Sequence, residues 1–261
     1  MSPRTVRNVV ITFRSAWKTA RAWNYVEHDP FHGVRLPRRQ RPQCFCFTIE
    51  EARRMLETAK EPFKTFCWLL AETGMRVGEL CGMKIDDLDL DAGIIRISRS
   101  AWRGKLGEPK TASSIRSFAL SPHLAEHLKS WIPKWWRPSA NRILFAARTG
   151  SPWDAQGIRK RKLKPLLQEL GIKVPRGAGF HGFRHLNATL MDQLNAPMKT
   201  RQQRLGHSDS KITLDVYTHA TSADDKRVAE EMSGILNRNL NRNGENENGS
   251  EGASSKPFVI N

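Results

Sequence analysis

The sequence predicts an α+β fold that is mostly helical. Two observations support this prediction: apolar residues recur every three or four positions in stretches near both ends of the chain, and a shorter central region alternates between apolar and polar residues. Helices followed by a small sheet and then by more helices are typical of such domains. With 261 residues, 39% of them hydrophobic, the chain can form one large domain, or one domain and a smaller one.

The first predicted element is an amphipathic helix over residues 5–26. A single amphipathic helix cannot bury its apolar face alone, so we expect it to pack on another element. The stretch 28–45 is rich in proline and arginine and has no hydrophobic period, which predicts a linker that crosses a phosphate backbone. Thr48 and Glu51 then form a capping box, which begins a helix that runs to about Ala59.

A further helix is predicted over 62–72, after which the hydrophobic period changes. The stretch "AGIIRISRSAW" (92–102) alternates and is rich in isoleucine, which predicts a strand, and "SIRSFAL" (114–120) predicts another. The polar stretch between them is long enough for a short middle strand and a turn, so we expect a small antiparallel three-stranded sheet. The stretch 142–147 is a candidate for one more short strand.

The chain after Trp153 is predicted to be helical, with Gly and Pro signals between the helices. The expected helices are 154–164, 165–171, 181–194, 198–206 and 210–219. Residues 239–261 are rich in Asn, Gly, Ser and Glu, and we expect them to be disordered. The tryptophans of "WIPKWW" (131–136) are interpreted as core and helix-end packing rather than as base-stacking platforms.

The composition is strongly basic, with a formal net charge of +17. This charge implies a polyanionic partner, most often nucleic acid, although a ribosomal or membrane-surface protein would share it. No apolar run approaches the roughly 18 residues that span a bilayer and no leader pattern opens the chain, so we expect a cytoplasmic protein with no membrane partner. Cys44 and Cys46 form C-x-C without a second Cys/His pair at zinc-finger spacing, so we expect buried or idle thiols and no bound metal.

Two stretches in the first half of the chain contain polar residues that local structure does not require. In "AETGMRVGELCGM", Arg76 opens a helical segment and Glu79 lies three residues on, on the same face. The alternative is a surface ion pair, worth a few tenths of a kcal/mol. In "GEPKTASSIRSFAL", Lys110 lies at a predicted turn between strands, from which a lysine can reach a ligand, although an ordinary surface lysine would look the same.

Two more such stretches follow in the second half. In "GFHGFRHLNATLM", His181 and Arg184 lie one helical turn apart at the start of a helix, where the helix dipole favours a phosphate. In "LGHSDSKITLDVYTHA", His207 precedes Tyr217, one of only 2 tyrosines in the chain.

Together, these four stretches resemble the tyrosine recombinase (phage integrase) family. "TGMRVGEL", "HGFRH" and "LGHSDSKITLDVYTHA" stand in the family's order and at about its spacings, with a lysine in a β-turn after the first, and the resemblance covers residues 46–236. It implies the tyrosine-recombinase catalytic fold. The domains it implies are a partial helical core-binding (DNA-binding) domain over 1–27, the linker 28–45, a catalytic domain over 46–238 and the tail 239–261.

The resemblance also implies a reaction that needs neither metal nor ATP, and no cofactor. Tyr217 matches the nucleophile, which would form a 3′-phosphotyrosine and free a 5′-hydroxyl. Arg76 and Arg184 would hold the non-bridging phosphate oxygens, for which planar bidentate donors suit better than a point charge.

The remaining roles are also implied by the resemblance. Lys110 matches the β-hairpin lysine, the expected general acid to the 5′ oxygen. His181 would assist proton movement at the tyrosine, and His207 would hydrogen-bond the scissile phosphate. Glu79 matches the carboxylate that follows the first arginine and would orient the site.

The partner that the resemblance implies is double-stranded DNA, with four protomers assembled on DNA when strands are exchanged. The segment 222–236 either packs in cis or docks on a neighbouring protomer. The basic run 159–164 contacts DNA phosphates or merely solvates a helix. Candidates for contact with the DNA backbone are Arg35, Arg38, Arg39, Arg41, Arg159, Lys160, Arg161 and Lys162.

Three functions remain open at this point. The first is an active site-specific recombinase or integrase. The second is an N-terminally truncated DNA-binding remnant with little or no strand exchange, because only about forty residues stand where the family usually has a full core-binding domain. The third is a relaxing enzyme of the type IB topoisomerase kind, which shares the phosphotyrosine chemistry.

Overall fold

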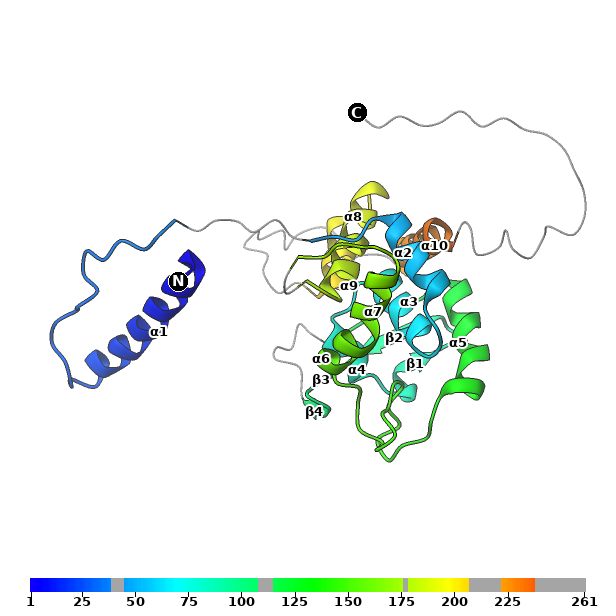
Figure 1. The fold of residues 1–261 in the computed structure, drawn as a ribbon, viewed down its shortest axis with the longest axis horizontal. Coiled ribbons are helices and arrows are strands. Elements are labelled where there is room, and N and C mark those ends of the chain that lie inside the picture. Colours follow the sequence, from blue (N-terminus) through cyan, green and yellow to red (C-terminus); the bar gives the residue numbers. More distant parts are fainter. Residues whose placement is uncertain (39–44, 108–114, 176–177, 207–221, 238–261) are drawn as a thin grey trace, which may run out of the picture. The chain divides into compact units, whose positions relative to one another are not determined.

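The computed structural model describes residues 1–38, 45–107, 115–175, 178–206 and 222–237, and the chain divides into two compact units, Met1–Cys44 and Phe45–Asn261 (Figure 1). The described part of the first unit contains one helix, α1 (Pro3–Ala22), which begins after the N-cap Ser2. Two arginines of α1 donate hydrogen bonds to later carbonyls, Arg7 to Pro37 at 2.8 Å and Arg14 to Val34 at 3.1 Å. The described part of the expected linker therefore folds back along α1.

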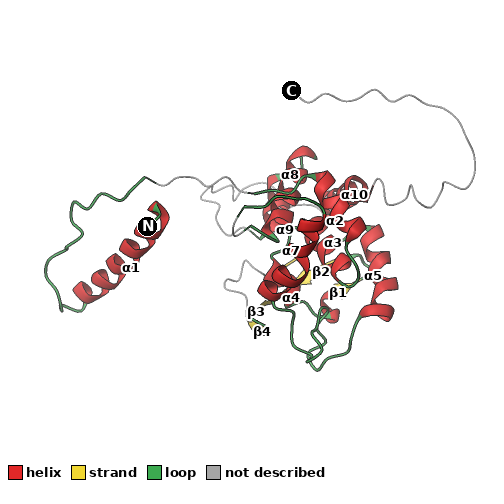
Figure 2. Cartoon of the chain, in the orientation of Figure 1, coloured by secondary structure: helices red, strands yellow, loops and turns green. Residues whose placement is uncertain are grey.

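The second unit is mostly helical, with short strands among the helices (Figure 2). Its helices are α2 (Ile49–Thr58), α3 (Phe63–Thr73), α4 (Val77–Cys81), the 3₁₀ turn η1 (Ile85–Asp87), α5 (Pro122–Trp135), α6 (Ala155–Ile158), the π-helical turn η3 (Arg159–Leu163), α7 (Lys164–Glu169), α8 (His181–Gln193), α9 (Met198–Leu205) and α10 (Ser222–Asn237). Its strands are β1 (Leu88–Asp89), β2 (Ile94–Ile97), β3 (Ser100–Trp102), β4 (Lys105–Gly107) and β5 (Arg116–Ala119).

Helix α3 is the centre of this unit. Every residue of α3 except Lys64 is buried, and the helix packs on α2, α4, α8 and α10. The ring of Phe66 lies 5.1–5.5 Å from three other rings, those of Phe145, Trp153 and Phe180. These contacts join α3 to distant parts of the chain, so α3 supplies a rigid base for the residues that follow it.

The predicted capping box at the start of α2 is confirmed. The Thr48 hydroxyl accepts a hydrogen bond from the Glu51 backbone N–H at 3.0 Å, and the Glu51 carboxylate accepts one from the Thr48 N–H at 2.9 Å. The helices predicted over 62–72, 181–194 and 198–206 are also confirmed to within about two residues at each end. The helix predicted over 210–219 and the disordered tail 239–261 lie outside the described residues.

The expected strand 92–102 is wrong in one respect, because it is two strands that belong to different sheets. β2 forms the middle of an antiparallel sheet of order β1-β2-β5, whereas β3 pairs with β4 in a separate two-stranded sheet. The chain diverges because β3 lies directly against α4. A Cβ on Gly82, the C-cap of α4, would lie 2.7 Å from the carbonyl carbon of Ser100, so only glycine fits there without movement. The predicted three-stranded sheet is therefore present, but its third strand is β1 and not the short strand expected between 92–102 and 114–120.

Two further differences concern residues 122–147. Helix α5, which the Ser121 hydroxyl caps at the Leu124 N–H, is absent from the predicted elements. The candidate strand 142–147 is wrong as a strand: among the described residues it forms isolated bridges, Ile143 with Lys84 and Ala146 with Pro152, although Ile143, Leu144 and Phe145 are all buried. Within "WIPKWW", Trp131 is buried and Trp136 donates from Nε1 to the Ile143 carbonyl, as expected of helix-end packing.

The segment 222–236, for which packing in cis and docking on a neighbouring protomer were both open, lies in helix α10. Val228 and Met232 are fully buried and Ile235 is partly buried, and the helix packs on α2, α3, α5, α8 and β5 of the same chain. The apolar stripe of this helix therefore packs in cis.

Replacing Gly82 with alanine should destabilise the second unit by about 1–3 kcal/mol, because the added methyl group overlaps the backbone of β3. Gly234→Ala in α10 is the matched control. No heavy atom lies within 4 Å of a Cβ there, so alanine should raise stability by up to about 1 kcal/mol. Urea unfolding of both variants measures the difference, and equal stability of the two would refute the packing argument.

Candidate functional site

The turn after α3 places Arg76 at the start of α4. Gly74 ends α3 in the left-handed conformation with a φ of 65°, and its N–H donates to the Leu70 carbonyl at 3.0 Å. Arg76 is the N-cap of α4, where the Glu79 carboxylate accepts its backbone N–H at 2.7 Å and its Nη1 at 2.9 Å. One carboxylate therefore holds both the backbone and the side chain of Arg76.

Glu79 also pairs with Arg116, a residue that the sequence analysis missed. Arg116 Nη1 and Nη2 donate to the two oxygens of Glu79 at 3.0 and 2.8 Å. The interpretation of Arg76 and Glu79 as a surface ion pair is wrong, because the Glu79 side chain is only 5% exposed. Burial alone would raise the pKa of Glu79, but hydrogen bonds and charge from Arg116, with the Arg76 donors, hold that pKa below its ordinary value.

A signal for Arg116 was present in the sequence. In β5 the residues at 116 and 118 are buried and the one at 117 is exposed, so Arg116 shares the inward face with Phe118. A charged residue on the buried face of a strand requires a partner. The partner, Glu79, is 37 positions earlier in the chain.

Arg184 lies on α8, and its side chain is buried. Its Nη1 donates to the Gly74 carbonyl at 2.8 Å, and its Nη2 donates to the Leu205 carbonyl. Burial, together with the positive charges of Arg76 and Arg116, lowers the pKa of Arg184 to about 10, so the guanidinium still carries its charge at neutral pH.

His181 lies one helical turn before Arg184, at the first position of α8, and is exposed. Partial desolvation and the positive charges of Arg184, His185 and Arg76 lower the pKa of His181 below its ordinary value. The imidazole is therefore neutral near pH 7, with a nitrogen able to accept a proton.

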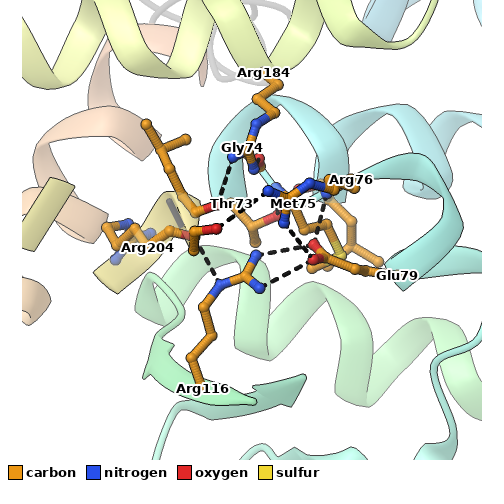
Figure 3. Close-up of polar contacts among 11 residues, drawn as sticks. Thr73, Gly74, Met75, Arg76, Glu79, Arg116, Arg184 and Arg204 are labelled. Carbon is orange, nitrogen blue, oxygen red and sulfur yellow. Dashed lines mark hydrogen bonds and ion pairs between the residues drawn. The ribbon is translucent and has the colours of Figure 1, made fainter. Parts of the chain in front are cut away.

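The C-terminal end of α9 joins these arginines (Figure 3). Three consecutive carbonyls each accept a hydrogen bond from a different arginine: that of Arg204 from Arg116 at 3.1 Å, that of Leu205 from Arg184, and that of Gly206 from Arg76 at 3.1 Å. The end of a helix carries partial negative charge, which suits guanidinium groups.

We call Arg76, Arg116 and Arg184 the arginine cluster. Glu79 is the carboxylate that pairs with it among the described residues, so three positive charges face one negative charge. The side chain of Arg76 is 40% exposed, whereas that of Arg116 is 4% exposed. An excess of positive charge with one open guanidinium favours an anion such as a phosphate diester.

The structure thus brings together four of the predicted site residues: Arg76, Glu79, His181 and Arg184. The other three, Lys110, His207 and Tyr217, lie outside the described residues. Lys110 falls between β4 and β5 in the sequence, and His207 directly follows Gly206.

The predicted DNA-backbone contacts lie in both units. Arg35 and Arg38 are exposed in the first unit, and Lys160, Arg161 and Lys162 are exposed on η3. Arg159, half-buried, donates to the Ala178 carbonyl at 3.2 Å. Arg39 and Arg41 lie outside the described residues.

Comparison with known proteins assigns a class to this fold and site. A model of the phage integrase family matches residues 46–224, which is more than half of the chain. The chain therefore belongs to the phage integrase family.

Individual relatives agree with this assignment. The chain is 31% identical to the integrase of Staphylococcus phage L54a over 180 residues, which are 64% of this chain and 50% of that protein. It is 28% identical to the tyrosine recombinase XerD of Listeria innocua over 228 residues, 84% of this chain and 73% of that protein. It spans about half the length of the L54a integrase and of the putative prophage phiRv2 integrase of Mycobacterium tuberculosis.

Solved structures show the same fold. The Tn1549 transposon integrase, solved in complex with transposon right end DNA, matches with a TM-score of 0.66 at 24% identity, covering 89% of this chain and 80% of that one. A lambda integrase tetramer bound to a Holliday junction matches with a TM-score of 0.57 at 19% identity, covering 80% and 59%. In the described part of this chain, no helix is both long and apolar enough to cross a membrane.

Replacing Glu79 with glutamine should lower the free energy of unfolding at pH 7 by about 3 kcal/mol, because a buried ion pair loses its negative partner. The folded-state pKa of Glu79 is depressed, so its contribution is present above the pKa of the unfolded chain and is lost as pH falls through the folded value. The difference between wild type and variant should therefore shrink in acid.

Urea unfolding from pH 7 down to the acid limit measures this effect. Glu50→Gln is the control, because Glu50 is 67% exposed and its 4.0 Å pair with Arg53 should contribute less than about 1 kcal/mol. A deficit of the Glu79 variant that stays constant at all pH values would contradict the proposed ionisation.

Proposed function

We propose that the chain is the catalytic part of a site-specific DNA recombinase or integrase that acts in the cytoplasm. It breaks and rejoins DNA through a 3′-phosphotyrosine, without metal or ATP. The observation that carries the proposal is the arginine cluster, with two arginines from motifs 108 positions apart held against the same helix end. Membership of the phage integrase family supports it.

Arg76 and Arg184 are the groups that would bind the scissile phosphate. Attack on a phosphodiester builds negative charge on the non-bridging oxygens, and fixed guanidinium groups stabilise that charge without reorganisation. Arg184 is buried and still charged, and Arg76 is open to solvent and steadied by Glu79. The pair therefore offers a rigid donor and an accessible one to the same phosphate.

Tyr217 is the proposed nucleophile. Its phenolic oxygen attacks phosphorus while the bond from phosphorus to the 5′ oxygen breaks, and Lys110 gives that oxygen a proton. A phenol has a pKa of about 10, so its proton must go to a base, and neutral His181 can accept it. His207 hydrogen-bonds the phosphate. The reverse steps rejoin the strands, because the phosphotyrosine ester conserves the bond energy.

The proposed partner is double-stranded DNA, on which four protomers would assemble to exchange strands. Two structural relatives were solved bound to DNA. The Tn1549 integrase is in complex with transposon right end DNA, and the lambda integrase is a tetramer on a Holliday junction. The exposed basic residues of η3 and of the segment 35–38 would contact the DNA backbone. Residues 1–27 would belong to a core-binding domain and 28–45 to its linker, with the catalytic domain over 46–238.

The test is formation of a covalent protein–DNA adduct. Nicked duplex fragments from either side of the chain's own gene are incubated with protein, since a nick on the 3′ side of the scissile phosphate lets the 5′-hydroxyl fragment escape. Wild type should give a slow, protease-sensitive DNA band on a denaturing gel, and Tyr217→Phe should give none while binding DNA with unchanged affinity. DNA binding by both proteins without any adduct would instead support the DNA-binding alternative.

The cleavage rate should also fall in acid, because protonated His181 cannot accept the tyrosine proton. The midpoint of this fall should lie below the ordinary pKa of histidine, since partial desolvation and then the positive charges of Arg184, His185 and Arg76 lower the pKa of His181. His181→Asn should lower the plateau rate about 100-fold and abolish the acid limb. Single-turnover rates between pH 5 and pH 8 measure both, and an identical acid limb in the variant would rule out this role.

A further inference from the structure

We propose that Arg116 is a positioning residue of the recombinase site: it holds Glu79 and the end of α9 in the arrangement that presents Arg76 to the scissile phosphate. The inference rests on the proposed function. It adds to the site a buried residue that acts through the groups it holds, Glu79 and the end of α9.

The first argument is how the oxygens of Glu79 are shared. Oε1 accepts from Arg116 Nη1 at 3.0 Å and from Arg76 Nη1 at 2.9 Å. Oε2 accepts from Arg116 Nη2 at 2.8 Å and from the Arg76 backbone N–H at 2.7 Å. Each oxygen thus binds both arginines. The two-pronged guanidinium of Arg116 fixes the plane of the Glu79 carboxylate, and the orientation of that carboxylate fixes the orientation of the Arg76 guanidinium.

The second argument concerns the other contact of Arg76, the Gly206 carbonyl at 3.1 Å. Arg116 fixes this point as well. Its Nε donates to the Arg204 carbonyl at 3.1 Å, and its guanidinium lies so close to Gly206 that a Cβ there would be 2.7 Å from Nη1. Both groups that hold Arg76, the Glu79 carboxylate and Gly206, therefore lie beside Arg116. Figure 3 draws the bonds from Arg116 to Glu79 and to the carbonyl of Arg204.

The third argument is burial. The side chain of Arg116 is 4% exposed, against 40% for Arg76. It also packs over the ring of Phe118, with its Cζ 5.9 Å from the ring centroid. A buried guanidinium in this position acts on a ligand through the residues that it orients. A lysine could keep the charge, but its single ammonium cannot reproduce the fork.

The experiment compares Arg116→Met, Arg116→Lys and the control Arg142→Met. Arg142 also forms an arginine–carboxylate pair, with Asp86, but both side chains are more than half exposed and lie outside the site. Adduct formation is followed at saturating protein on the nicked fragments, alongside thermal unfolding and DNA affinity.

We expect Arg116→Met to slow cleavage about 100-fold and Arg116→Lys at least about tenfold, because Arg76 loses its orientation. DNA affinity should change less than about threefold, because the Arg116 side chain is only 4% exposed and backbone contacts come mainly from exposed residues. Arg142→Met should cleave at the wild-type rate. If the methionine variant does not fold, the lysine variant decides, and a wild-type rate for any folded Arg116 variant would overturn the inference.

A second readout separates positioning from general damage to the fold. A scissile methylphosphonate, in which a methyl group replaces one non-bridging oxygen, removes the charge that Arg76 would neutralise. The ratio of wild-type to Arg116→Lys rates should then fall at least about fivefold below its value on ordinary DNA. An unchanged ratio would mean that the substitution does not act through Arg76.

A third readout does not depend on catalysis. Carbon NMR titration should show the pKa of Glu79 rising in the Arg116 variants, and the peptide covering residues 198–206 should exchange its amide hydrogens faster. If wild type forms no adduct, the proposed function fails, yet these two measurements still decide whether Arg116 holds Glu79 and the end of α9. If both are unchanged, the inference fails even where wild type cleaves DNA.

Discussion

The site depends on the burial of one carboxylate, that of Glu79, between two arginines. Removing a carboxylate from water is unfavourable unless its oxygens are fully hydrogen-bonded, and here each oxygen accepts two hydrogen bonds. Those bonds also link α4 to β5, which are otherwise separate parts of the unit. The hydrogen bonds that the buried Glu79 carboxylate requires thus fix the geometry of α4, of β5 and of the partly exposed Arg76 guanidinium.

The end of α9 provides the second constraint. Its last carbonyls lack partners within the helix and would otherwise face solvent or a buried surface. Arg116, Arg184 and Arg76 satisfy three of them in succession. The arginines are consequently held in place by the protein before any phosphate is present, and so little reorganisation is required of them when an anion binds.

Local signals explain what could be predicted from the sequence. The capping box of Thr48 and Glu51 and the one-turn spacing of His181 and Arg184 in α8 act within a few residues, so they are visible in a short window. The split of the strand 92–102 is not visible there, because it results from the close approach of Gly82 to β3. Arg116 was missed for a similar reason: its inward place in β5 was readable, but its partner Glu79 belongs to another element.

The exposure of the arginines bears on how the cluster would bind the proposed phosphate and keep its own hydrogen bonds. A guanidinium has five N–H donors. Arg76 uses one on Glu79 and one on Gly206, and its side chain remains 40% exposed, so it can add a phosphate oxygen to these bonds instead of exchanging them. If these internal bonds are kept, the proposed phosphate would be placed relative to the end of α9. The end of α9 is in turn held by Arg116, Arg184 and Arg76, and this makes Glu79 and its arginines the reference point for the described part of the site.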